Sequence, residues 1–234
     1  MDNRGPSRID LQRCLAALPL FVDASAEDLA RVAQGCALRG FDRGQAVYRM
    51  GEACGEFHVA VLGHVKLYML SPAGQEKVLE IAGPGHCFAE SLLFTGGGYD
   101  THAQALTDAL VLSIGRKVVV AEIERDPRFS LRMLDLVSRR VRGLVRDVEE
   151  YSLCNGAQRV IGYLLRAAPP GAPCGHGVTV SLAVSKATVA SRLSLTPEYF
   201  SRVLHELEGE GLIRIDRRQI RIPDPGRLAG WQAQ

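Results

Sequence analysis

Residues 184–222 read VSKATVASRLSLTPEYFSRVLHELEGEGLIRIDRRQIRI, and this stretch decides the fold of the C-terminal part of the chain. A helix is predicted from Thr196, because threonine is a good N-cap and Pro197 suits the first helical position, where its missing N–H is not needed. An apolar row then repeats at three- and four-residue spacing and must be buried. This row is Phe200, Val203, Leu204 and Leu207.

The opposite face of this helix carries four polar side chains at positions i, i+3, i+4 and i+7. They are Glu198, Ser201, Arg202 and His205. An arginine can bond guanine O6 and N7, a glutamate can accept from cytosine N4, and the first turns of a recognition helix enter the major groove. The row therefore predicts base reading by Glu198, Ser201 and Arg202, although a solvated amphipathic helix would show the same pattern.

The flanking sequence favours DNA recognition. Upstream, Ser185 is the predicted cap of another helix that ends only about two residues before Thr196, which is the spacing of a helix-turn-helix. Downstream, residues 212–222 alternate apolar and polar side chains around Asp216-Arg-Arg-Gln, as a hairpin would. Together they predict a winged helix-turn-helix, whose hairpin tip would touch phosphates, although an exposed basic turn needs no partner. The expected backbone or auxiliary contacts are Lys186, Thr188, Thr196, Tyr199, His205, Arg217 and Arg218.

Length and composition indicate a globular chain of two domains. The 234 residues are 23% charged and 47% hydrophobic, which is typical of folded proteins. No signal-peptide layout and no run of roughly eighteen apolar residues occurs, so a cytoplasmic protein without a membrane segment is expected. Residues 152–234 hold ten Lys and Arg against six Asp and Glu, whereas residues 1–151 hold eighteen against twenty. The positive charge therefore lies in the same region as the motif.

The cysteines show no C-x-x-C pair. A disulfide framework or a thiolate metal site would need closer clustering, so buried free thiols are expected. The six are Cys14, Cys36, Cys54, Cys87, Cys154 and Cys174.

The front of the chain has a different pattern. From about residue 41 to residue 114, short β-patterned runs alternate with glycines, which predicts a barrel or a double-sheet roll. Before it, Ser25 and the acids that follow predict a short helix.

Residues 125–153 predict a long helix with one narrow apolar line. This line is Leu134, Val137, Val141, Leu144, Val148 and Tyr151. It can pack on the β domain of the same chain or on a second copy. A homodimer is favoured, because a helix-turn-helix protein usually reads two half-sites related by a twofold axis. The expected organisation is α+β, with a sensor over 1–124, a dimerisation helix over 125–153 and a winged helix-turn-helix over 154–234.

With these segments in order, the chain resembles the Crp/Fnr superfamily of bacterial transcription regulators over nearly its whole length. The resemblance is carried by Gly44, Gly51-Glu52, Val61–Tyr68, Gly85–Glu90 and Leu193–Arg202. The amino-acid sequence of residues 65–80 and 88–94 is most similar to that of the Dnr-type branch. Regulators of this branch control denitrification and respond to nitric oxide through haem. The resemblance implies a β-roll (jelly-roll, cyclic-nucleotide-binding-like) effector domain, a TTGAT-like half-site for Glu198, Ser201 and Arg202, and RNA polymerase as a partner.

Positions at which this sequence differs from the family pattern reduce the number of candidate effectors. Members that bind cAMP hold its phosphate with an arginine, whereas here residues 99–105 read YDTHAQA, and Asp100 would repel a phosphate. No cAMP is therefore expected. An iron–sulfur cluster is not expected either, because Cys14 stands alone near the N-terminus. The effector pocket is expected at Phe88, Glu90 and His102.

Haem stays open as a cofactor at this stage, and no metal ligand can be assigned. Cys87 beside His86, or Cys174 near His176, offers thiolate or imidazole, but no spacing demands haem. A regulator that answers a different small molecule remains an alternative. So does a cyclic-nucleotide-like regulatory subunit of an enzyme, although an enzyme is not expected because no nucleophile elbow, P-loop or metal-binding His-Glu pair occurs.

Overall fold

The computed structural model describes residues 10–169 and 177–231. The chain forms two compact units, the first from Met1–Met69 with Leu79–Arg142, and the second from Leu70–Val78 with Gly143–Gln234. None of the helices in the described residues combines the length and the apolarity that crossing a bilayer requires.

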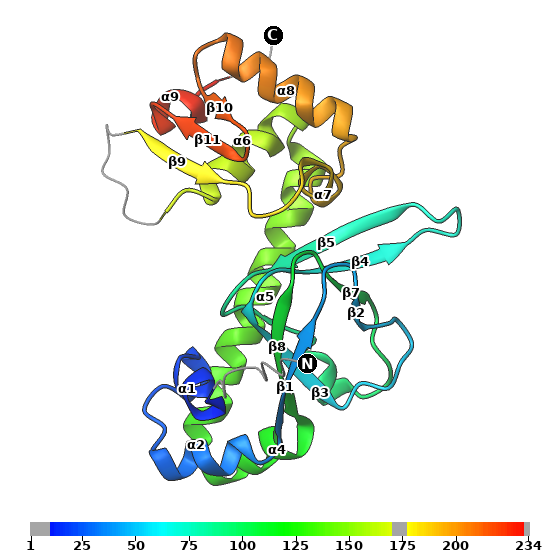
Figure 1. Cartoon of the computed structure of the whole chain (residues 1–234), viewed down its shortest axis with the longest axis vertical. Helices are drawn as coiled ribbons and strands as arrows, with labels where there is room; N and C mark the ends of the chain where they lie inside the picture. The colour runs from blue at the N-terminus through cyan, green and yellow to red at the C-terminus, as the bar shows by residue number, and fades with distance from the viewer. Residues whose placement is uncertain (1–9, 170–176, 232–234) are drawn as a thin grey trace, which may run out of the picture. The chain divides into compact units, whose positions relative to one another are not determined.

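The first unit contains two four-stranded antiparallel sheets, ordered β1-β8-β3-β6 and β2-β7-β4-β5 (Figure 1). The strands are β1 (Cys36–Phe41), β2 (Ala46–Tyr48), β3 (Glu56–Leu62), β4 (Val65–Leu70), β5 (Glu76–Ala82), β6 (Cys87–Phe88), β7 (His102–Ala105) and β8 (Ala109–Gly115). The turn end of the β4–β5 hairpin belongs to the second unit. Between β3 and β4, Gly63 has φ +74, and a Cβ there would lie 2.2 Å from the Asp108 carbonyl oxygen, so this tight turn requires glycine.

Alternation along β3 divides the side chains between two cores. Phe57 and Val59 join the cluster formed with the surrounding helices. Ala60 joins the cluster inside the roll, where the ring of His58 also lies against Tyr48. The predicted double-sheet roll is therefore confirmed.

Helices cover the outer face of the first sheet. They are α1 (Leu11–Ala16), the 3-10 turn η1 (Pro19–Phe21), α2 (Ala26–Ala33), α4 (Arg116–Arg125) and the start of α5; the short α3 (Leu92–Thr95) follows β6. The helix expected at Ser25 is α2, and its capping box is complete, because Ser25 Oγ accepts from Asp28 N and Asp28 Oδ2 accepts from Ser25 N. Phe21 of the 3-10 turn packs on Phe129 of α5, with ring centroids 5.6 Å apart.

The long helix α5 (Pro127–Leu153) is uninterrupted over 27 residues (Figure 1). It begins two residues later than predicted, because Asp126 Oδ1 accepts from Arg128 N at 3.0 Å and caps the helix. Its large exposed apolar side chains include Leu131, Leu134, Val141, Leu144, Val145, Val148 and Leu153. Five of the six predicted seam residues are thus exposed, Tyr151 the least of them at 36%, whereas Val137 is half-buried.

The second unit is a winged helix-turn-helix. Its elements are α6 (Gly156–Arg166), β9 (Val178–Ser181), α7 (Lys186–Arg192), α8 (Pro197–Gly209), β10 (Arg214–Asp216), β11 (Gln219–Ile222) and α9 (Pro225–Ala229). The strands form one antiparallel sheet in the order β10-β11-β9. The predicted fold class, with a β-roll, a long helix and a winged helix-turn-helix, is confirmed.

Candidate nucleic-acid interface

The first two turns of α8 present the polar row to solvent. Thr196 caps the helix, since its side chain accepts from Tyr199 N at 3.2 Å. The apolar row is buried, with Phe200 and Leu204 fully covered. Glu198, Arg202 and His205 are therefore exposed, and Ser201 is half-buried beside them. They are exposed on α8 and not in the core because the helical period places them opposite the buried row.

The two charged residues of this row are free to bind a ligand. In the part of the chain that the structure describes, neither the Glu198 nor the Arg202 side chain makes a hydrogen bond or an ion pair, and the Arg202 guanidinium lies 4.8 Å from the Tyr199 ring centroid. His205 is held more firmly, because its Nδ1 lies 2.7 Å from the Ser201 carbonyl oxygen. A carbonyl can only accept, so Nδ1 carries a proton and Nε2 faces away from this bond.

Several residues that were predicted as auxiliary DNA contacts also pack or form hydrogen bonds within the protein. Tyr199 is half-buried against Gly156, where a Cβ would lie 2.5 Å from the tyrosine ring. Tyr199 therefore positions α8 and supports Arg202. The hydroxyl of Thr188 lies 2.8 Å from Ser185 Oγ, which caps α7. Lys186 is half-buried in the first turn of α7.

The β10–β11 hairpin, or wing, carries more exposed arginines than the two that were predicted to contact DNA. Asp216 pairs with Gln219, so Arg217 and Arg218 form a two-residue turn in which Arg217 has φ 54. Arg214 and Arg221 are exposed and directly opposite each other in the β10–β11 ladder. Like charges in register destabilise a sheet, whereas a row of phosphates would offset their repulsion. This pair was not among the predicted contacts, although the alternation of residues 212–222 already placed both side chains outward.

A lysine from the β4–β5 hairpin clamps the end of α7 within the second unit. Lys77 Nζ bonds the carbonyl oxygens of Ser191 and Arg192 at 2.9 Å each, Ser194 Oγ at 2.7 Å and the Tyr151 hydroxyl at 3.1 Å. A cation at a helix C-terminus satisfies carbonyls that have no partner within the helix. Burial, together with the nearby Arg192, lowers the pKa of Lys77 to about 8.

Other residues complete this clamp. Tyr151, which was expected in the dimer seam, donates to the Arg192 carbonyl oxygen at 2.7 Å. Arg192 in turn bonds both carboxylate oxygens of Asp147 at 2.8 Å, and Arg159 donates to the Leu193 carbonyl at 2.8 Å. This cluster was not predicted, because no local sequence pattern marks a lysine that lies 114 residues from its partner Ser191.

In the first unit, aromatic side chains fill the interior of the roll. The rings of Tyr48 and Tyr99 stack with centroids 3.6 Å apart. His58 is 2% exposed, with Nδ1 2.9 Å from Ser113 Oγ and Nε2 2.8 Å from the Tyr99 hydroxyl. Burial lowers the pKa of His58 to about 3, so this imidazole is neutral and both its nitrogens are engaged.

The three residues expected in the effector pocket have different surroundings. Phe88 is buried in the roll interior, where it contacts the rings of Tyr48 and His58. Glu90 is also buried, and burial raises the pKa of its carboxyl. His102 is half-buried on β7 and stacks on Tyr68 at 5.1 Å.

A separate apolar cavity of about 310 Å³ lies beside β6 and α5 in the first unit. It is lined by Leu18, Pro19, Leu20, Gly85, Cys87, Leu131, Arg132, Asp135, Leu136 and Arg139. Cys87 contributes a sulfur atom, which is a soft metal ligand, to the lining of this cavity. Burial raises the pKa of its thiol to about 12. Among the described residues, no cluster of three or more His, Cys, Asp and Glu could hold a metal ion. Cys174 and His176 lie outside the described residues.

Comparison with known proteins assigns both units. Residues 38–126 match the cyclic nucleotide-binding domain family, and residues 158–231 match the Crp-like helix-turn-helix domain family. A relative from Mycobacterium tuberculosis, the CRP-like cAMP-activated global transcriptional regulator, is 26% identical over 81% of this chain and 85% of its own.

Solved structures agree with these matches. DNR from Pseudomonas aeruginosa is 33% identical, with 96% of this chain and 98% of that chain covered and a TM-score of 0.50. FixK2 from Bradyrhizobium japonicum is 22% identical and covers 85% of this chain and 98% of that chain. Its TM-score of 0.75 supports the fold.

Proposed function

Because the chain belongs to the Crp/Fnr superfamily of bacterial transcription regulators, we propose that it reads a TTGAT-like palindrome as a homodimer. It is a DNA-binding regulator of the Crp/Fnr type. We propose in addition that it recognises this palindrome, that it forms a dimer and that it responds to the effector discussed below. The observation that carries it is the exposed Glu198 and Arg202 on the first turns of a well-capped α8, whose side chains form no hydrogen bond or ion pair with the described residues.

Each side chain has a role that follows from its chemistry. Arg202 bonds guanine O6 and N7 with both arms of its guanidinium, and Glu198 accepts from cytosine N4. Ser201 adds a contact near the same base edge. The wing arginines bind phosphates and set the register on the duplex without reading sequence. RNA polymerase, which the family implies, is the proposed protein partner.

The apolar side of α5 supports the proposed dimer. Leu134, Val141 and Val148 are all more than half exposed on one helix. A second copy of α5 would bury this row through an isologous contact, in which both chains use the same surface. The resulting twofold axis would present two α8 helices to half-sites about one turn of DNA apart.

An effector other than cAMP is proposed. The relative from Mycobacterium tuberculosis is described as cAMP-activated, but residues 99–105 of this chain contain Asp100 and no arginine. In addition, the stacked Tyr48 and Tyr99 occupy the inside of the roll. Calorimetric titration with cAMP should therefore give no binding heat, and saturable binding would contradict this part of the proposal.

Nitric oxide or redox state, sensed through haem, is the proposed signal. The apolar walls of the 310 Å³ cavity match the apolar face of a porphyrin, and Arg139 can pair with a propionate, but the cavity is smaller than the whole macrocycle. An iron ligand fits less well, because no histidine lines this cavity and the buried Cys87 thiol keeps its proton. The haem proposal therefore rests on the resemblance to the Dnr-type branch and on the apolar walls of this cavity.

Two experiments test these proposals separately. Gel retardation with a TTGAT palindrome and a scrambled duplex tests DNA reading, and a failure to prefer the palindrome in any effector state would contradict it. An absorption spectrum after haem reconstitution, with and without nitric oxide, tests the signal. A featureless spectrum would remove haem and leave the DNA proposal intact.

A further inference from the structure

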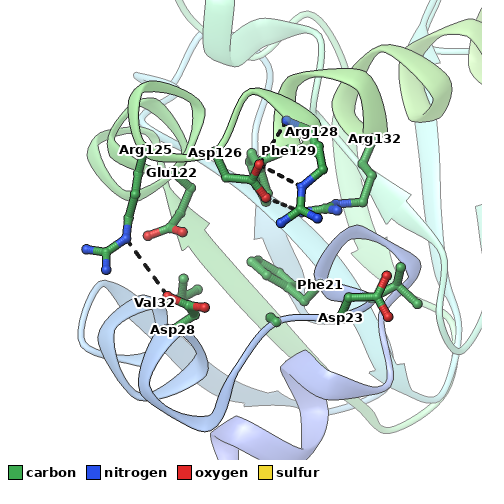
Figure 2. Close-up of a pocket in the computed structure, with 12 residues that line it drawn as sticks. Phe21, Asp23, Asp28, Val32, Glu122, Arg125, Asp126, Arg128, Phe129 and Arg132 are labelled. Carbon is green, nitrogen blue, oxygen red and sulfur yellow. Dashed lines mark hydrogen bonds and ion pairs between the residues drawn. The ribbon is translucent and has the colours of Figure 1, made fainter.

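A second cavity, of about 300 Å³, lies in the first unit among α2, α4 and the start of α5 (Figure 2). Its base includes Phe21, Val32 and Phe129, which are almost fully buried and therefore present only a little apolar surface to the cavity. Its rim carries Arg125, Arg128 and Arg132 together with four carboxylates. The volume is at the lower end of the range for small-molecule sites.

Three of these carboxylates are already engaged by other residues. Glu122 receives hydrogen bonds from Arg31 on both oxygens, at 2.9 and 3.0 Å. Hydrogen bonds from Ser25 and Arg31 lower the pKa of Asp28 to about 2. Asp126 Oδ1 accepts from the backbone N and the Nε of Arg128, both at 3.0 Å. Each of these acids therefore already has basic or N–H partners, so they do not provide a cation site.

The arginines, in contrast, keep unused donors. The Arg132 side chain is 23% exposed, and its only hydrogen bond among the described residues is 3.4 Å long, to Asp126 Oδ2. Its Nε atom is buried and has no partner in that part of the chain. Arg125 approaches Asp28 only to 4.0 Å and is 62% exposed. A guanidinium with too few acceptors is costly, so an anion that bonds the exposed part of the Arg132 guanidinium would offset part of that cost.

The geometry points to a single negative charge on a flat apolar body. We propose that this cavity binds a small organic monocarboxylate, whose oxygens accept from Arg132 and whose body lies on Phe21 and Phe129. Figure 2 shows the guanidinium groups of Arg128 and Arg132 next to these two rings. Asp23 is an exposed acid on the rim whose charge acts on Arg128, and it disfavours a phosphate dianion more than a monoanion. The site is distinct from the DNA-reading face.

Phenylacetate is the probe that separates charge from shape, with phenylacetamide as its neutral counterpart. Saturation-transfer NMR and calorimetry on the full chain should show phenylacetate binding that is roughly tenfold or more tighter than phenylacetamide binding, because a hydrogen bond to a charged group is strong. Inorganic phosphate should not displace it. Equal affinity for acid and amide, displacement by phosphate or no binding of phenylacetate would overturn the proposal.

Variants locate the site. Arg132→Met should weaken phenylacetate binding roughly ten- to a hundredfold, whereas Arg142→Met, an exposed change on the same helix, should leave it unchanged. Asp126→Asn should tighten binding severalfold, because it removes a competing charge and asparagine still caps α5. A gain cannot result from misfolding. Unchanged binding in Arg132→Met, or weaker binding in a folded Asp126→Asn protein, would place the ligand elsewhere.

Discussion

Replacement of Arg202 by alanine isolates the proposed base contact from the fold. The guanidinium is exposed and makes one described contact, the stacking on Tyr199 at 4.8 Å. Losing such a contact at an exposed site costs about 0.5–1 kcal/mol, and the better helix propensity of alanine offsets a few tenths of that. The free energy of unfolding should therefore fall by less than about 1 kcal/mol.

The effect on DNA recognition should be larger and specific to one base pair. A bidentate arginine–guanine contact provides about 1–3 kcal/mol of discrimination, which corresponds to roughly a 5- to 160-fold preference. Arg202→Ala should lose that preference. Arg202→Lys should retain only part of it, because an ammonium cannot bond both acceptors with the geometry of the guanidinium.

Fluorescence anisotropy at one fixed salt concentration can measure this. Two duplexes are needed, the TTGAT palindrome and a copy in which the G·C pair of one half-site is replaced by A·T. The wild-type protein should distinguish the two, and Arg202→Ala should bind them almost equally. Arg217→Ala on the wing serves as the control, since it should weaken both complexes alike. If Arg202→Ala kept the wild-type ratio of affinities, the assignment of Arg202 as a base reader would be wrong.

The remaining predictions test other parts of the chain. Arg214→Thr should stabilise the free protein by about 0.2–1 kcal/mol in urea unfolding, because it removes a like-charge pair, and should weaken DNA binding; a less stable variant would contradict this. Lys77→Met should lower the free energy of unfolding by about 1–3 kcal/mol, since it leaves carbonyl oxygens of α7 without a donor; an unchanged urea midpoint would show that the clamp contributes nothing. Val141→Glu should convert a dimer into a monomer in analytical ultracentrifugation, because the charge would be buried in the seam; a retained dimer would move the interface off this row. Hydrogen bonds from Ser25 and Arg31 lower the pKa of Asp28 from 3.8 to about 2, so the stability that Asp28 contributes is present above pH 3.8 and declines as the pH falls toward 2. The stability of Asp28→Asn should therefore change less between about pH 4 and about pH 2 than that of the wild type. Identical acid-unfolding profiles for the two proteins would contradict a stabilising role for the Asp28 carboxylate.

Local features of this protein could be predicted from sequence. Thr196 and Ser185 cap their helices as expected, and the buried row of α8 is the predicted one. The Asp216–Gln219 pair closes the predicted hairpin. These features depend on residues only two to four positions apart, so capping chemistry and periodicity are sufficient to predict them.

The function of individual side chains within a helix was predicted less completely. The exposed side of α5 was predicted from its 3.5-residue pattern, but Tyr151 at its end uses its hydroxyl on the Arg192 carbonyl. Likewise, no sequence pattern shows whether Phe88 and His102 lie close together. In the structure their rings have different partners, His58 for Phe88 and Tyr68 for His102. Contacts of this kind depend on which strand lies beside which.

By itself, the sequence determined the winged helix-turn-helix, the β-roll, the long helix and the polar row of α8, because helical and strand periodicity divide side chains into buried and exposed sets. Only the tertiary structure decided that Lys77 caps α7, that aromatic rings fill the roll, and that Arg132 keeps a buried Nε without a partner over Phe21 and Phe129. The physical reason is that these arrangements bring together residues far apart in the chain, and their energies come from burial and from hydrogen bonds that form only when the core closes.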